Sequence, residues 1–123
     1  MATNCEIRVF RVIKIDCDID WSSLKKELII QVEEKLASRK PVDPSNKTGL
    51  LEMETIITAA DSTDFTISLT SQAIFSFDEM PENFEDTLQK DCYPIAKVKV
   101  YEAIKKITEA MGMSPLDLNA YSK

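Results

Sequence analysis

The feature that most constrains the fold of this chain is a long alternating segment followed by a long helical one. From Phe65 to Phe77, apolar residues occupy most odd positions, and the even positions are mainly polar and uncharged. A period of two predicts a strand, and its thirteen residues span roughly 40 Å, well beyond the usual strand length. The charge-free even face suits contact between the sheets of two subunits, although an ordinary solvated face is the alternative.

The segment from Asp91 to Met111 predicts one long helix. Asp91 can serve as the N-cap, Pro94 is tolerated in the first turn, and Gly112 supplies a left-handed C-cap. An apolar stripe and a charged face follow a helical period in its C-terminal half. Its N-terminal half carries apolar residues all round, whereas one sheet covers only one side of a helix. The other side is therefore expected to meet a second subunit, a loop or a bound chain.

Three further strands are expected upstream. The first runs from Glu6 to Ile15, with Ile7, Val9, Ile13 and Ile15 on one face and Phe10 and Val12 on the other. Ser22 to Ser38 shows both a helical period of four and a strand alternation, and we interpret residues 27–37 as a strand because the following strands need partners. A third strand follows a proline-containing turn, from Leu50 to Ala60. The prediction is an α+β fold: a single domain, residues 1–123, with a four-stranded antiparallel sheet followed by one long C-terminal helix.

An acidic connector from Asp78 to Asp91 separates the last strand from the helix. Met80, Phe84 and Leu88 recur every four residues within it, which predicts a short amphipathic helix. Two interpretations stay open: these three residues cap the core, or they form a mobile flap over an apolar groove.

Composition excludes several classes of function. The chain has no histidine and two glycines, which removes the common catalytic triads, the commonest transition-metal ligand and any glycine-rich phosphate loop. We therefore expect neither an enzyme nor a cofactor nor a metal site. Fifteen basic residues are scattered among 21 acids, for a net charge of −6, which argues against nucleic acid as a partner.

The same sequence argues against membrane insertion and secretion. No apolar run approaches the roughly 18 residues that span a bilayer, and the first residues do not resemble a signal peptide. Three widely spaced cysteines, Cys5, Cys17 and Cys92, do not suggest a disulfide framework. A cytoplasmic protein with reduced thiols is the expectation.

The last third of the chain resembles SecB, the bacterial protein-export chaperone. Ile74-Phe75-Ser76-Phe77 is similar to the Ile-Phe-Ser-Ile that ends the family's last strand, and Cys92-x-Pro94 is similar to the Cys-Pro that opens its long helix. Glu102-Ala103-Ile104 falls where the family has Glu-Cys-Ile, Gly112 at its helix-stop glycine, and Pro115-x-x-Leu118-Asn119 near its Pro-x-Leu-Asn-Leu. These pieces keep their order and near-constant spacing over about 45 residues.

The resemblance implies an ATP-independent chaperone for unfolded or partly folded polypeptides, assembled as a homotetramer from two dimers. It also implies an export role with SecA as a partner, for which Asp16 and Asp20 keep an acidic spacing seen in the family. Apolar and aromatic residues that would line a client groove are Ile74, Phe75, Phe77, Met80, Phe84, Tyr93, Ile95, Val98 and Tyr101.

Three alternatives remain open. One is a SecB-like chaperone dedicated to a specific client such as an antitoxin. Another is a small-ligand-binding or thioesterase-like α+β domain, which would need an acid or base beside a closed pocket. The third is an obligate oligomer with a structural role alone.

Overall fold

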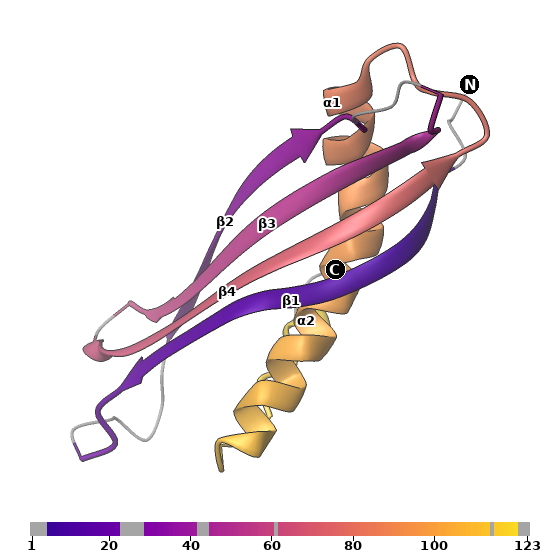
Figure 1. The fold of residues 1–123 in the computed structure, drawn as a ribbon. Coiled ribbons are helices and arrows are strands. Elements are labelled where there is room, and N and C mark those ends of the chain that lie inside the picture. Colours follow the sequence, from indigo (N-terminus) through magenta and orange to yellow (C-terminus); the bar gives the residue numbers. More distant parts are fainter. Residues whose placement is uncertain (1–4, 23–28, 42–44, 61, 114, 121–123) are drawn as a thin grey trace.

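The computed structural model describes residues 5–22, 29–41, 45–60, 62–113 and 115–120, and its elements follow the predicted order (Figure 1). The strands are β1 (Cys5–Ile19), β2 (Ile30–Arg39), β3 (Thr48–Ala59) and β4 (Ser62–Phe77), and the helical elements are α1 (Phe84–Thr87), η1 (Leu88–Cys92), α2 (Tyr93–Ala110) and η2 (Leu118–Ala120). The predicted fold class, a four-stranded antiparallel sheet followed by one long helix, is confirmed. The ambiguous segment forms strand β2, although positions 27 and 28 of the predicted strand lie outside the described residues.

The sheet has the order β1-β4-β3-β2, and α2 crosses one of its faces (Figure 1). Strands β3 and β4 alternate between buried odd positions and half-buried even positions along their described residues. The odd positions face α2 and hold most of the core, including Leu51, Phe65 and Phe75. We call this the inner face and the even-numbered face of β4 the outer face. The alternation predicted for β3 and β4 is therefore confirmed.

Strand β1 is longer than predicted, and its predicted faces are wrong. Register shifts lie between Ile7 and Val9 and between Val12 and Lys14, where β1 contributes an extra residue against β4. Such bulges rotate the following side chains onto the other face of the sheet. Residues in register share a face, so pairing with the odd positions of β4 puts Ile7, Phe10, Val12 and Ile15 on the inner face. Val9 pairs with Ile74 and lies on the outer face.

The two predicted helices form one continuous helical run. The segment α1 passes into the π-helical turn η1 and then into α2, and Cys92 rather than Asp91 occupies the cap position of α2. Nothing between Phe84 and Tyr93 removes a backbone donor or adds a steric break, so the chain has no reason to leave the helix at Asp91. At the other end Gly112 has φ of +87°, the left-handed conformation predicted for the C-cap.

The segment after α2 folds back along the helix. Thr108, which is fully buried, accepts a hydrogen bond from the backbone N–H of Leu116 at 2.9 Å. The side-chain amide of Asn119 donates to the carbonyl of Val98 at 3.4 Å. These bonds hold η2 against α2. Among the described residues, no helix has both the length and the apolar character required to cross a membrane.

Candidate functional site

The structure separates the predicted client-binding residues into four locations instead of one groove in the protomer. Four are buried in the core: Phe75, Phe77, Phe84 and Tyr101. Met80 and Tyr93 are half-buried at the margin of that core. Ile74 lies half-buried on the outer face of the sheet, beside Val9.

The remaining two predicted residues, Ile95 and Val98, lie on the exposed side of α2. Their exposed fractions are 38% and 45%. The buried residues of the helix, such as Ala96, Val100 and Ile104, occupy the side that faces the sheet. The expectation that the N-terminal half of α2 has apolar groups on a side the sheet does not cover is thus confirmed.

Residue Phe84 anchors the connector to the sheet. Its ring lies 6.3 Å, centroid to centroid, from Phe77 in an edge-to-face arrangement, and Leu88 is also fully buried. A methyl group on Gly49 would come within 2.8 Å of the Phe84 ring, so the ring packs directly against the glycine backbone. This geometry favours the interpretation of Phe84 and Leu88 as a cap on the core.

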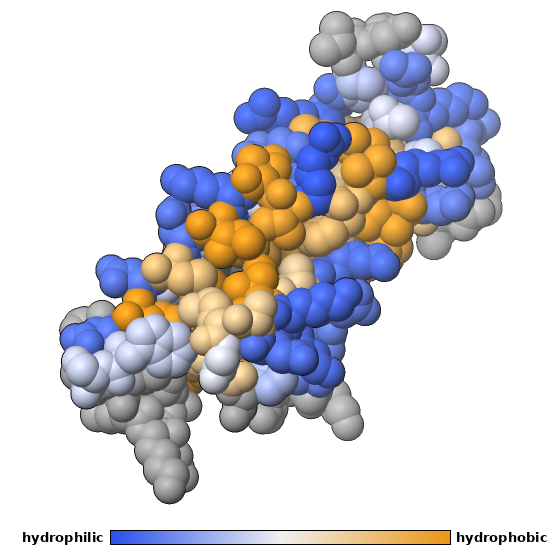
Figure 2. Space-filling view, turned by 60° about the horizontal axis from the view of Figure 1, so that its bottom comes forward, coloured by the Kyte–Doolittle hydropathy of each residue, from blue (hydrophilic) through white to orange (hydrophobic). Residues whose placement is uncertain are grey.

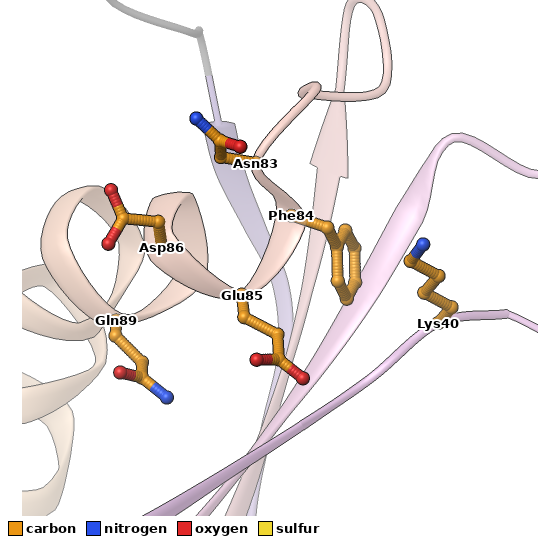
Figure 3. A pocket seen from close by; sticks show the side chains of 6 residues that line it. All are labelled: Lys40, Asn83, Phe84, Glu85, Asp86 and Gln89. Atoms are coloured by element: carbon orange, nitrogen blue, oxygen red, sulfur yellow. The ribbon is translucent and has the colours of Figure 1, made fainter.

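A hollow of about 540 Å³ adjoins Phe84 (Figure 3) and is lined by Lys40, Asn83, Phe84, Glu85, Asp86 and Gln89. The Phe84 ring extends from α1 toward Lys40, whose Nζ lies 5.8 Å from the ring centroid. Five of the six lining residues are polar or charged, so this hollow does not have the apolar lining expected of a client groove.

An apolar surface lies where β1 and α2 come together. Of the four strands, β1 lies nearest to α2, and the C-terminal half of the helix runs past the β1 edge (Figure 1). Figure 2 shows apolar residues gathered in a diagonal band over this region, with hydrophilic residues along both borders. On the strand, the inner-face residues Ile7, Phe10 and Val12 are half-buried, and Ile15 is 46% exposed.

The side of α2 that faces β1 follows from the position of Glu34. Glu34, on β2, interacts electrostatically with Lys97 and Tyr101 of the helix. The edge of the buried helix surface that carries Lys97 and Tyr101 therefore faces β2. The half-buried Ala103 and Ile107 lie at the opposite edge and hence toward β1. We call the surface formed by Ile7, Phe10, Val12, Ile15, Ala103 and Ile107 the β1–α2 band.

The sequence did not predict the β1–α2 band because the two bulges in β1 change which residues share a face. A strict period of two assigns Ile7 and Phe10 to opposite faces, whereas the extra residue puts both on the inner face. One signal was present: apolar residues three apart in a segment that otherwise reads as a strand. That spacing fits a bulged strand.

A polar cluster lies between β2 and α2. Burial raises the pKa of Glu34 above its ordinary value, while the nearby Lys97 charge and the Thr55 hydroxyl oppose the shift. Burial first, and then the Glu34 charge, raise the pKa of Tyr101. The Lys97 ammonium lies 5.4 Å from the centre of the Tyr101 ring. The cluster lies on the side of α2 away from the β1–α2 band.

The two predicted acidic partner-binding residues do not share one surface of β1. Asp16 pairs with Ser68, points to the outer face and forms an ion pair with Lys14 at 3.3 Å. Asp20 lies beyond the strand, where it accepts hydrogen bonds from the backbone and hydroxyl of Ser22. Asp18 is in register with Thr66 and is the acid nearest to Asp16 along the outer face of β1.

The described residues contain no group of three or more cysteines, aspartates or glutamates placed to hold a metal ion.

Comparison with known proteins gives no matching family model and no matching curated protein. Among solved structures the chain is similar to the Mycobacterium tuberculosis SecB-like chaperone Rv1957, in complex with a ChAD peptide from the antitoxin HigA1 (Rv1956). The TM-score is 0.74 and the identity 16%, over 92% of this chain and 86% of the other.

The fold is SecB-like. This similarity covers nearly the whole chain, including the upstream strands, for which the sequence resemblance gave only strand number and length. The fold therefore extends the likeness from the strand and helix of the C-terminal third to the complete sheet.

Proposed function

We propose that this protein is an ATP-independent chaperone that binds unfolded or partly folded polypeptides at the β1–α2 band. The single observation that carries the proposal is this apolar surface on a SecB-like fold. A contiguous apolar surface bordered by polar residues is typical of a site that binds another chain. Client segments with apolar side chains would gain roughly 25 cal/mol for each Å² of apolar surface removed from water.

The proposal includes assembly as a tetramer of two dimers. Ile95 and Val98 are exposed apolar residues on the side of α2 that the sheet leaves uncovered. Packing this side against the α2 helix of another protomer would bury both residues. The outer face of β4, with its uncharged Thr66, Ser68 and Thr70, suits the contact between sheets.

Two refinements concern the client and the site of action. The solved SecB-like chaperone binds a peptide from an antitoxin, and this favours a dedicated client as the second candidate function. For a general export role in the cytoplasm, SecA would be the partner, and Asp16 with Asp20 remain the proposed acidic contacts.

The test is suppression of aggregation of a chemically unfolded client, followed by light scattering without nucleotide. We expect Ile15→Asp to remove protection, because it places a charge on the β1–α2 band. Ile29→Asp is the control: Ile29 is a 64% exposed apolar residue just before β2, at the opposite edge of the sheet from β1. The mass of both variants in solution should be measured alongside, so that loss of assembly is not taken for loss of binding.

Equal protection by both variants would contradict the assignment of the β1–α2 band. If the wild-type chain protects none of several unrelated clients, the dedicated-client function is favoured over the general one. Titration with antitoxin-derived peptides would then measure its selectivity directly.

A further inference from the structure

Two cysteines from opposite ends of the sequence meet where β1 begins and α2 begins. Cys5 is in register with Phe77, the last residue of β4, and Cys92 is the last residue of η1. The Sγ of Cys5 lies 4.0 Å from the carbonyl oxygen of Asp91, the residue next to Cys92. Cys92 is fully buried, and Cys5 is half-buried against the same core.

We propose that Cys5 and Cys92 form a reversible disulfide that locks the segment α1–η1 to the sheet. Phe77, paired with Cys5, and Cys92 flank the connector at its two ends, residues 78–91. A covalent bond from Cys5 to Cys92 therefore holds the far end of the connector beside its beginning. Cys17, the third cysteine, is exposed near the other end of β1 and takes no part.

The reaction requires an oxidant, and a small-molecule disulfide such as oxidised glutathione supplies it. The Cys5 thiolate attacks one sulfur of the oxidant, forms a mixed disulfide and releases one glutathione thiolate. The Cys92 sulfur then attacks Cys5 Sγ and releases the second glutathione. Both protein thiols lose a proton, and the two electrons end on the two released glutathione thiols.

The order of attack follows from the surroundings of each thiol. Burial and the neighbouring Cys5 thiol raise the pKa of Cys92 far above its usual range, so Cys92 is a poor first nucleophile. Cys5 has access to solvent and meets the oxidant first. The second step is slow for the same reason. We therefore expect the Cys5–Cys92 disulfide to form slowly from the mixed disulfide.

The test treats the folded Cys17→Ser chain with oxidised glutathione and analyses the product by intact mass and peptide mapping. We expect a species that has lost two hydrogens and yields a peptide pair linked through Cys5 and Cys92. Cys5→Ser in the same background should lose that linkage. Cys5 is half-buried, so this variant is expected to fold.

Two further measurements examine the lock itself. Oxidation of the Cys17→Ser chain should raise its urea midpoint, because the bond closes a long loop in the unfolded chain. It should also slow amide exchange in residues 84–92, and both changes should reverse with a reducing thiol. A product with glutathione on Cys5 and no Cys5–Cys92 linkage would overturn the proposal, as would a linkage with an unchanged or lowered midpoint. These readouts do not involve clients, so they stand independently of the chaperone proposal.

Discussion

The packing of Phe84 on Gly49 predicts that Gly49→Ala destabilises the wild-type chain but stabilises the Phe84→Ala chain, as a double-mutant cycle would show. A Cβ added at Gly49 would lie 2.8 Å from Cζ and 2.9 Å from Cε2 of the Phe84 ring, and 3.2 Å from Cε2 of Phe77. Gly49 does not have a positive φ, so alanine meets no backbone strain there. Gly49→Ala should therefore destabilise the protein because of these two rings, of which Phe84 makes the closer contacts.

The magnitudes follow from burial. Phe84 is 5% exposed, so Phe84→Ala should cost about 3–5 kcal/mol for the emptied site. Gly49→Ala in the wild-type chain should cost roughly 1–3 kcal/mol from overpacking. In the Phe84→Ala background the same methyl group enters the vacated space and also restricts the unfolded chain. There we expect it to stabilise by about 0.4–1 kcal/mol.

The assay is urea unfolding of all four chains at one fixed protomer concentration, because assembly makes apparent stability depend on concentration. The coupling between the two positions should be at least about 1 kcal/mol, as is usual for residues in contact. Additive costs would refute the contact. A cost of Phe84→Ala below about 1 kcal/mol, together with weakened client binding, would instead restore the flap interpretation of the connector.

Three other predictions concern assembly, pH and the C-terminal segment. Val98→Asp should split the tetramer, seen as a lower mass by light scattering, because an unpaired charge is costly to bury. An unchanged mass would exclude this side of α2 from the interface. Because the pKa of Glu34 is raised in the folded state, its stabilising contribution is complete below its ordinary pKa, near 4.3, and is lost as pH rises through the raised value. Glu34→Gln should thus raise the urea midpoint at pH 7 but not at pH 4, and equal shifts at both would contradict the assignment. Thr108→Val should cost about 1–3 kcal/mol in urea unfolding, since the Leu116 N–H loses its acceptor; a neutral effect would show that water replaces the hydroxyl.

Much of the sheet could be predicted from the sequence because β3 and β4 are inner strands with neighbours on both sides. Their residues from Leu51 to Ile57 and from Phe65 to Phe77 follow the pleat without interruption, so a period of two translates directly into burial. Strand β2 needed tertiary context, because its pattern also fits a helix and only pairing with β3 decides between them. The faces of β1 could not be predicted, since a bulge depends on how an edge strand twists against its neighbour.

The site was harder to predict because aromatic and aliphatic residues serve both core and surface. Phe75, Phe77 and Tyr101 were candidates for client contact, yet they are buried in the core between the sheet and α2. The exposure of Ile95 and Val98 was predicted correctly, because a helix apolar on every side exceeds what one sheet can cover, whereas their role in client binding stays a prediction. Ile15 was recognised as apolar, but its place on the inner face of the sheet depends on the two bulges that precede it.

The π-helical turn η1 has a consequence for how relatives of this protein would align. Buried residues recur at every fourth position from α1 through α2: Phe84, Leu88, Cys92, Ala96, Val100, Ile104 and Thr108. In a regular α-helix a step of four residues overshoots a full turn by about 40°, so such a series would drift around the axis. The wider turn at Leu88–Cys92 takes back part of that drift and keeps Phe84 and Ala96 toward the sheet. A relative that lacks the extra residue would form an uninterrupted α-helix and would align only with a gap inside that helix. Sequence comparison rarely places gaps in helices, so such relatives would be matched one residue out of step on one side of the turn.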